Sequence, residues 1–249
     1  MTLDDAALER YARHIVLREI GGAGQVRLAA ARIALVGAGG IGSPAIQYLA
    51  AAGVGTLVLI DDDHVDLGNL QRQTIFATDD VGAAKVDAAA RAVARINPAV
   101  AVEPHRTRIF PANAASLVAG CDVVVDGSDN FATRLAVADA CHAARVPLVS
   151  AAVAQFEGQL AVYRGWEAHL PCYRCLIGDD PNRDGTSCAE IGVLGAMAGV
   201  MGSLAALEAI RAVVPFGDDP AGRLLIADAL AFRFRTVTVP KDPGCRCAA

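Results

Sequence analysis

The sequence contains no run of five or more basic residues, and its formal net charge at pH 7 is −5. Proteins that bind nucleic acid neutralise its phosphates with clustered lysine and arginine, so we expect no nucleic-acid partner. The first residues, Met1-Thr2-Leu3-Asp4-Asp5, are acidic and no apolar segment follows them. A secretory signal has a basic start and an apolar core instead. We therefore expect a cytoplasmic protein.

Charged residues are missing from two long stretches, residues 33–60 and residues 191–207. Several glycines and Pro44 interrupt the first stretch, which indicates strand, turn, helix and strand rather than one span. The second stretch lies between Glu190 and Glu208 and also contains glycines. A membrane-spanning helix needs about 20 consecutive, mainly apolar residues. We predict a buried helix in the second stretch and no contact with a membrane.

Short apolar runs alternate with helical patterns over residues 31–152, the predicted nucleotide-binding half. Continuous apolar strands joined by helices are typical of a parallel sheet that is covered on both faces. The predicted strands are residues 32–36, 56–60, 101–103, 123–126 and 147–151, and the predicted helices are residues 41–52, 83–96 and 131–144.

Two flanking segments complete the predicted architecture. In the N-terminal segment, residues 1–30, a short helix over residues 8–17 is expected to end at Gly21-Gly22-Ala23-Gly24. In residues 153–249 polar and apolar residues alternate as in antiparallel strands, and one further long helix is predicted near residues 190–213. The predicted fold class is α/β: one domain, residues 1–249, with a doubly wound, mostly parallel, Rossmann-like sheet that antiparallel strands extend.

A glycine-rich turn follows the first predicted strand. Its residues, Gly37-Ala38-Gly39-Gly40-Ile41-Gly42, match the G-x-G-x-x-G pattern, which lets the backbone approach phosphates at the start of a helix. Asp61 ends the next strand, where a carboxylate can bind a ribose hydroxyl. Taken alone, this turn indicates a nucleotide or dinucleotide, and an NAD(P)-dependent oxidoreductase is its ordinary interpretation.

More polar and cationic residues follow Asp61 than a nicotinamide site requires. They are Asp61-Asp62-Asp63, Asn69-Leu70-Gln71-Arg72-Gln73 and Lys85. A forked arginine and a compact lysine charge both suit a triphosphate. Ser128-Asp129-Asn130 follows the fourth strand, where an aspartate is well placed to hold magnesium. Alternatively, Arg72 and Lys85 are solvated charges, and Asp129 caps the following helix.

Together these motifs resemble the ThiF/MoeB/HesA family, the bacterial relatives of the ubiquitin-activating enzymes. The resemblance covers essentially the whole chain. The residues that carry it are Tyr11-Ala12-Arg13-His14, Gly37–Gly42, Asp61-Asp62-Asp63, Asn69-Leu70-Gln71-Arg72-Gln73, Lys85, Ser128-Asp129-Asn130, Cys172-Tyr173-Arg174-Cys175 and the final cysteine pair.

The resemblance implies an enzyme that uses MgATP to adenylate the C-terminal carboxylate of a ubiquitin-like sulfur-carrier protein ending in Gly-Gly. It implies that Asp61 binds the ribose and that Asp129 coordinates magnesium. Arg13 would reach the triphosphate of the other subunit, so the resemblance also implies a homodimer with shared sites. The residues expected to hold the phosphates are Asn69, Arg72, Gln73 and Lys85, and Asp63, Ser128 and Asn130 complete the nucleotide site.

Adenylation also agrees with the residue types. A carboxylate nucleophile is already anionic at neutral pH, so no Ser-His-Asp arrangement is needed. The difficulty is to bring this anion to the α-phosphorus of another anion, and cations with magnesium solve it by positioning and charge stabilisation. A second alternative function, a binding module without catalysis, conflicts with the presence of Arg13, Arg72, Lys85 and Asp129 together.

Four of the seven cysteines form two close pairs, Cys172/Cys175 and Cys245/Cys247. Four thiolates are enough for a tetrahedral structural zinc site. Family members usually have C-x-x-C in the second pair, whereas this chain has C-x-C, so free thiols or a disulfide are the alternatives. Cys121 and Cys141 lie in apolar patterns and are expected in the core.

Cys188 stands at the position where some family members accept the acyl group of the carrier. It follows a polar loop, residues 179–185, and a small buried thiol is the other interpretation. The surrounding Ser187-Cys188-Ala189-Glu190 resembles the molybdopterin branch more than the thiazole branch. We see no rhodanese-type domain, so sulfur is expected from a separate donor of the cysteine desulfurase or rhodanese type.

Overall fold

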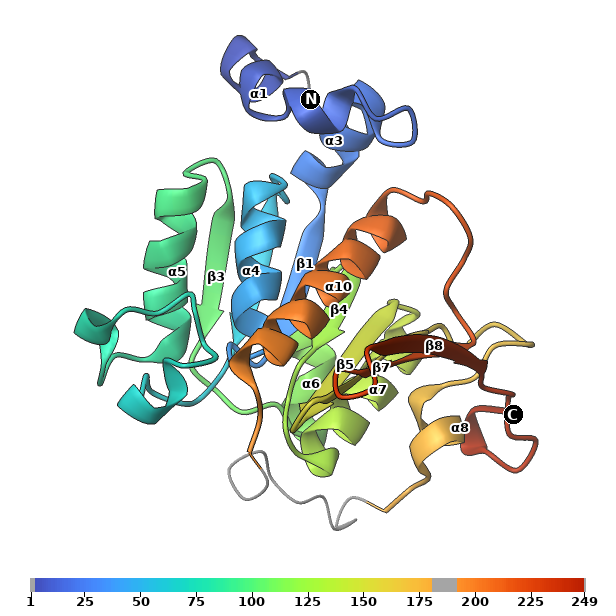
Figure 1. Ribbon diagram of the computed structural model, residues 1–249. Coiled ribbons are helices and arrows are strands. Elements are labelled where there is room, and N and C mark those ends of the chain that lie inside the picture. The colour runs from blue at the N-terminus through green and yellow to red at the C-terminus, as the bar shows by residue number, and fades with distance from the viewer. Residues whose placement is uncertain (1–2, 181–191, 249) are drawn as a thin grey trace.

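Eight strands form one sheet in the computed structural model, which describes residues 3–180 and 192–248 (Figure 1). Their order is β3-β2-β1-β4-β5-β6-β7-β8, with the first five strands parallel and the last three antiparallel. This confirms the predicted fold class. The strands are β1 (Arg32–Val36), β2 (Thr56–Ile60), β3 (Ala101–His105), β4 (Val123–Asp126), β5 (Leu148–Ala154), β6 (Glu157–Tyr163), β7 (Arg223–Asp228) and β8 (Arg233–Thr238).

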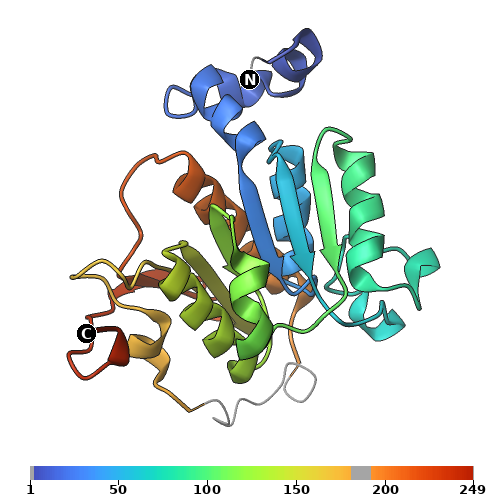
Figure 2. The same ribbon diagram turned by 180° about the vertical axis from the view of Figure 1, so that it is seen from behind.

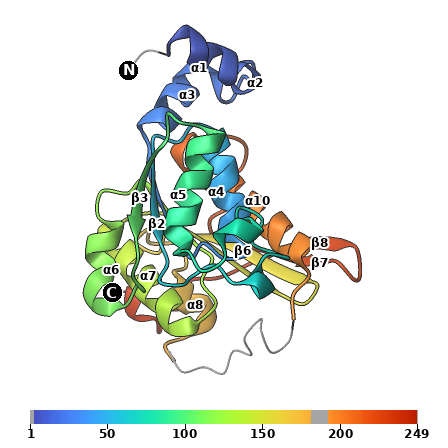
Figure 3. The same cartoon turned by 90° about the vertical axis from the view of Figure 1, so that its left-hand side faces the viewer.

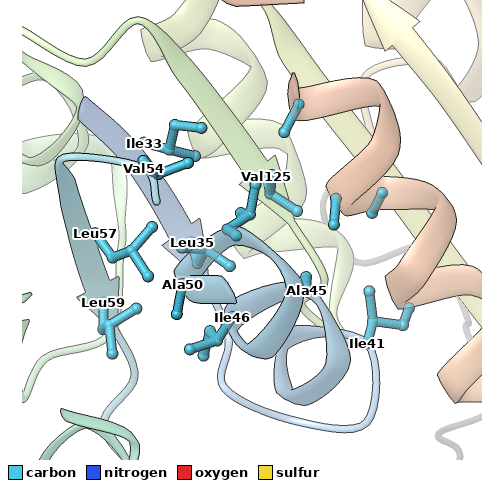
Figure 4. Close-up of a cluster of buried hydrophobic side chains, with 14 of the residues drawn as sticks. Ile33, Leu35, Ile41, Ala45, Ile46, Ala50, Val54, Leu57, Leu59 and Val125 are labelled. Atoms are coloured by element: carbon cyan, nitrogen blue, oxygen red, sulfur yellow. The ribbon is translucent and has the colours of Figure 1, made fainter. Parts of the chain in front are cut away.

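Helices cover both faces of the parallel strands, which is why those strands are apolar along their whole length. In β1, Ile33 and Leu35 point into one buried cluster, and Ala34 and Val36 point into the other. Figure 4 shows the first cluster, where Leu35 lies beside residues of α4. The helices α4 (Gly42–Ala51), α5 (Lys85–Ile96) and α10 (Gly195–Val213) cover that face, and α6 (Pro111–Val118) and α7 (Phe131–Ala144) cover the other (Figure 2).

The helix α10 meets the length and hydropathy criteria for a membrane span, with a mean hydropathy of 1.4 over its most apolar window. Core helices of soluble proteins meet the same criteria. Met197 and Met201 of α10 are buried in the cluster shared with β1 and α4. At Gly202 an added Cβ would lie 2.2 Å from the carbonyl oxygen of Ile41, so the glycine permits close packing against the start of α4. We assign α10 to the core.

The N-terminal segment differs from the prediction. The glycines at residues 21–24 do not end a helix; they begin α3 (Gly21–Ala30), which follows the short helices α1 (Asp5–Arg10) and α2 (Ala12–Ile15). Gly21 makes the turn with a φ of 59°. At Gly24 an added Cβ would lie 2.9 Å from Val214, so this glycine lets α3 approach the residue after α10.

Two short helices, α6 and α8 (Tyr173–Ile177), were not predicted. Pro111 begins α6, and the side chain of Asn113 accepts a hydrogen bond from the Phe110 amide, which fixes the first turn. Figure 3 shows α1–α3 at the end of the molecule opposite α8 and the C-terminus. The N-terminal segment therefore stands away from the carboxyl ends of the parallel strands.

Candidate functional site

A cavity of about 440 Å³ opens at the carboxyl ends of β1, β2 and β4. Between β1 and β4 the strand order reverses direction, and ligands of open α/β sheets bind at such a point. Of the residues predicted to bind the cofactor, only Gly42 is missing from its walls. Those that line it are Gly37, Gly39, Gly40, Asp61, Asp63, Asn69, Arg72, Gln73, Lys85, Ser128, Asp129 and Asn130.

The glycine turn folds tightly between β1 and α4. Gly37 has a φ of 88°, a conformation that residues with a side chain rarely adopt. Gly42 does not touch the cavity, because its role is to pack: an added Cβ would lie 2.0 Å from the carbonyl oxygen of Gly37. The turn thus places the backbone before the N-terminal end of α4 beside the cavity.

Asp61 joins this turn to the segment after β2. Its Oδ2 accepts a hydrogen bond of 2.7 Å from the amide of Ala38, and its Oδ1 accepts one of 2.8 Å from the amide of Asp63. Burial raises the pKa of Asp61, while nearby Lys85 and the two amides act in the opposite direction. The carboxylate is therefore held in one orientation at the cavity wall.

Two cations lie on the side of the cavity formed by α5 and residues 69–73. Nζ of Lys85 donates a hydrogen bond of 2.8 Å to Oδ2 of Asp63, and the Lys85 side chain is 5% exposed. Arg72 donates 2.7 Å from Nη2 to Oδ1 of Asn69. Burial rules out the interpretation of Lys85 as a solvated surface charge, and both cations already have a neighbouring oxygen that fixes their position.

The loop after β4 forms the third side of the cavity. Asn130, not Asp129, caps α7, because its Oδ1 accepts a hydrogen bond of 2.9 Å from the amide of Thr133. The interpretation of Asp129 as the helix cap is therefore wrong. Its carboxylate is exposed, with Oδ1 3.5 Å from Nδ2 of Asn130, at the limit of a hydrogen bond. An exposed carboxylate at this edge is free to meet a cation.

Arg134 is a buried cation that the sequence analysis did not single out. Its guanidinium donates to the carbonyl oxygen of Ser128, to that of Ala151 at 2.9 Å and to Oγ of Ser150 at 3.2 Å. It also lies 3.8 Å from the carboxylate of Asp126. One side chain therefore ties the loop after β4 to the middle of β5. The available signal was a single arginine within an otherwise apolar part of α7.

Thr107 and Arg108 also line the cavity and were not predicted. They follow β3, and Nε of Arg108 lies 3.3 Å from the carboxylate of Asp62. The signal for them was their position directly after a strand that ends at the same edge of the sheet. With Arg72, Lys85 and Arg134, Arg108 is one of four cations that line the cavity, alongside the carboxylates of Asp61, Asp62, Asp63 and Asp129.

Buried polar atoms beside the cavity lack a partner among the described residues. They are Oε1 of Gln73 and Oγ of Ser128. A buried polar atom without a hydrogen bond costs free energy, on the order of 1–3 kcal/mol. Both residues line the cavity, so a polar ligand there would satisfy them. The walls thus fit a nucleotide with its phosphates: glycine amides, four cations and unsatisfied polar groups.

Arg13 is not among the residues that line this cavity in the described part of the chain. It lies in α2, which belongs to the N-terminal segment at the amino end of β1 (Figure 1). The neighbouring His14 is hydrogen-bonded through Nδ1 to Oε1 of the buried Gln25, at 3.1 Å, and this contact helps to fix the segment. The structure therefore does not bring Arg13 to the site of its own chain.

The four cysteines of the two pairs come together at the end of the molecule opposite the N-terminal segment. The sulfur atom of Cys172 lies 3.8 Å from that of Cys175 and 3.6 Å from that of Cys245. The sulfur atom of Cys247 lies 3.6 Å from that of Cys175 and 3.3 Å from that of Cys245. A disulfide needs about 2.05 Å. A tetrahedral zinc with bonds of about 2.3 Å needs sulfur atoms about 3.8 Å apart, so the cluster fits zinc despite the short C-x-C spacing.

The remaining cysteines divide into two groups. Cys121 and Cys141 are buried, as expected, and burial raises the pKa of both thiols. Cys188 lies outside the described residues, so its prediction stays untested.

Comparisons with known proteins agree with one another. The model of the ThiF family matches residues 11–247. The chain is 47% identical over 247 residues to "SAMP-activating enzyme E1" of Haloferax volcanii, covering 98% of this chain and 90% of that protein. It is 42% identical over 246 residues to "Molybdopterin-synthase adenylyltransferase" of Escherichia coli K12, covering 98% and 97%.

Of two further similarities, one covers about half of the other protein and the second concerns the fold alone. The chain is 48% identical over 240 residues to "Adenylyltransferase and sulfurtransferase MOCS3" of Bos taurus, covering 96% of this chain but only 52% of that protein. Among solved structures, E. coli MccB with ATP has a TM-score of 0.82 at 23% identity, covering 96% of this chain and 74% of that one. At this identity the similarity concerns the fold alone.

Proposed function

This chain belongs to the ThiF family, and we propose that it uses MgATP to adenylate the C-terminal glycine carboxylate of a ubiquitin-like sulfur-carrier protein. One observation carries the proposal: the glycine turn, the cations Arg72 and Lys85 and the exposed Asp129 surround one cavity. The names of the relatives are those of adenylyltransferases and a SAMP-activating enzyme, and one of them favours molybdopterin synthesis as the pathway.

In the proposed reaction, a carboxylate oxygen of the carrier attacks the α-phosphorus of ATP. A bond forms between these atoms, the bond from the α-phosphorus to the bridging oxygen breaks, and pyrophosphate leaves with that electron pair. Asp129 would hold the magnesium ion, which supplies charge neutralisation when bound. Arg72 and Lys85 would bind the phosphates, and Asp61 would bind the ribose. Fixed charges of this kind stabilise the transition state without reorganising.

The two alternative functions, an oxidoreductase and a binding module without catalysis, fit the cavity less well. An NAD(P)-dependent oxidoreductase does not require four cations in the cavity beside the glycine turn, and the relatives above carry no such name. A silent binding module does not require a buried Lys85 or an exposed Asp129 at the same cavity.

We further propose a homodimer in which Arg13 completes the cavity of the partner. Arg13 lies away from the cavity of its own chain, and apolar side chains near it are exposed. Val16 is 74% exposed and Leu17 is 50% exposed. A second copy that covers them would bury this apolar surface and bring Arg13 to a second site.

The carrier is proposed to dock on an apolar patch formed by Phe156, Leu194, Leu230, Phe232 and Phe234, which are all exposed, Phe232 by 97%. Exposed apolar patches mark protein-binding surfaces. The amide of Ala229 donates to the carbonyl of Phe156 at 3.0 Å, so the two hairpins that supply the patch are joined.

The patch continues into the cavity. Val193, which precedes Leu194, and Val153, three positions before Phe156, line the cavity. A carrier seated on the patch can therefore extend its C-terminal tail along these residues toward the phosphates.

Zinc in the four-cysteine cluster, a cytoplasmic location and a separate sulfur donor of the cysteine desulfurase or rhodanese type complete the proposal. The sulfur spacing supports the zinc. For the donor, the similarity to MOCS3 covers about half of a protein whose name includes a sulfurtransferase.

The proposed function is tested by ATP–pyrophosphate exchange with purified carriers of the molybdopterin and thiazole types. We expect exchange that requires the carrier and is lost when its final Gly-Gly is removed. Absence of exchange with either carrier, together with reduction of NAD(P) by a small substrate, would favour the oxidoreductase instead.

A further inference from the structure

The four-cysteine cluster is assembled from two distant parts of the chain. Cys172 and Cys245 are 73 positions apart in the sequence, and Cys175 and Cys247 are 72 apart. Bringing such distant segments together costs conformational entropy. Unless other residues hold the two pairs side by side, binding of the metal must offset this cost.

Each pair encloses an arginine, and both arginines bind one carboxylate of α7. Arg174, between Cys172 and Cys175, donates to Asp139 through Nε at 2.7 Å and Nη2 at 2.8 Å. Arg246, between Cys245 and Cys247, donates through Nη2 to Oδ2 of the same Asp139 at 2.9 Å. Asp139 therefore touches both halves of the cluster.

Other contacts near the cluster link it less directly. Asp179 accepts a hydrogen bond of 2.6 Å from Arg174, but it lies 3.7 Å from Arg246 and is 72% exposed. Lys241 ties the C-terminal segment to the carbonyl oxygens of Gly165 and Glu167 at 3.0 and 3.3 Å, upstream of the first cysteine pair. Asp139 differs because it stands on a packed helix of the core and bridges the residues between the metal ligands themselves.

We propose that Asp139 is a positioning residue that assembles the four-cysteine site, holding its two halves together through Arg174 and Arg246 before the metal binds. The inference rests on the zinc that forms part of the proposed function. Residues outside the ligand shell that orient the ligands typically change metal affinity 10- to 100-fold when they are substituted. Here the orienting group acts on two ligand pairs at once.

The test measures zinc directly. Protein is purified as wild type, Asp139→Asn, Asp179→Asn and Glu103→Gln, its zinc content is determined by mass spectrometry, and release of zinc to a chromogenic chelator is then followed in time. Glu103 is the matched control, because it forms a two-point ion pair with Arg32 that includes a contact of 2.7 Å and lies apart from the cluster. Circular dichroism and thermal melting establish that each variant is folded.

We expect folded Asp139→Asn to release zinc about 10- to 100-fold faster than wild type. Asp179→Asn should have a smaller effect and Glu103→Gln none. Asp139→Glu, which keeps the charge, should release zinc more slowly than Asp139→Asn. If Asp139→Asn does not fold, Arg246→Ala, which alters only an exposed side chain, should show the same fast release.

Equal release from Asp139→Asn and wild type, or from Arg246→Ala and wild type where Asp139→Asn does not fold, would overturn the inference while leaving the zinc site intact. Wild-type protein without zinc would overturn both. Neither result bears on adenylation, which the exchange assay measures separately.

Discussion

The inner strands of the parallel half and the edge strand of the antiparallel half have opposite surroundings. In β1, β2 and β4 almost every residue is buried, whereas every residue of β8 is exposed. Strands covered on both faces fix the loops at their ends, so the parallel half is suited to hold charges in set positions. An exposed edge strand is suited to meet another protein. We infer that nucleotide chemistry and carrier recognition are divided between the two halves.

The largest effect on activity is expected when charged side chains are removed from the cavity at the parallel half of the sheet. Arg72→Ala, Lys85→Ala and Asp129→Ala should each nearly abolish carrier-dependent ATP–pyrophosphate exchange, because loss of one preorganised contact costs about 3 kcal/mol or more in the transition state. Asp79→Ala, at an exposed position in the short 3-10 helix Thr78–Asp80, is the control for loss of a charge. If all three variants exchange at the wild-type rate, these residues do not hold the triphosphate.

Mixed dimers test the role of the N-terminal segment, which belongs to neither half of the sheet. Dimers of one Arg13→Ala chain and one Lys85→Ala chain should recover up to about half of the wild-type exchange, because one of their two shared sites keeps both cations. Exchange is measured on dimers purified with two different tags. Activity no higher than that of either parent variant would argue against Arg13 acting on the partner's site.

Substitutions in the antiparallel half should affect recognition rather than chemistry. Phe232→Ser removes the most exposed apolar side chain of the patch, and burial of a phenylalanine contributes about 1.5–3 kcal/mol. We expect the KM for the carrier to rise about 10- to 100-fold while kcat is unchanged. Val81→Ser, an exposed apolar residue outside the patch, should behave as wild type. A lower kcat at saturating carrier would show that the two halves are not separate.

The smallest effect is expected at Cys188. The helix predicted to begin near Glu190 would favour a thiolate, but the structure begins α10 only at Gly195. Glu190 also opposes a thiolate, and no cation follows the cysteine directly. Cys188→Ala should therefore keep wild-type exchange, with any defect confined to thiocarboxylate formation when a sulfur donor is supplied. A folded Cys188→Ala protein without exchange would place this cysteine in the adenylation step.

Much of the parallel half could be predicted because its signals are local. The bounds of β1, β2 and β4 follow from apolar runs and from the glycine turn, those of α7 follow from a helical pattern, and the structure confirms all four. The polar residues at the strand ends were also found, because parallel strands bring their carboxyl ends to one edge.

What could not be predicted depends on contacts between distant residues. Arg134 and Arg108 look like ordinary helix and loop cations until the fold brings them to the cavity. Asp139 acquires its partners only when residues 174 and 246 meet. At Gly21 and Gly24 the glycine pattern predicts the end of a helix, and the prediction is wrong because the close approach of Val214 to Gly24 is invisible in the sequence.

The central claim, that this chain attaches AMP to a carrier protein, is tested most directly by the mass of the carrier. Carrier, chain and MgATP are incubated without a sulfur donor and analysed by intact-protein mass spectrometry. We predict a carrier with one AMP on its C-terminal glycine, formed by wild-type protein and not by Lys85→Ala. An unmodified carrier in the presence of folded, ATP-binding wild-type protein would contradict the account.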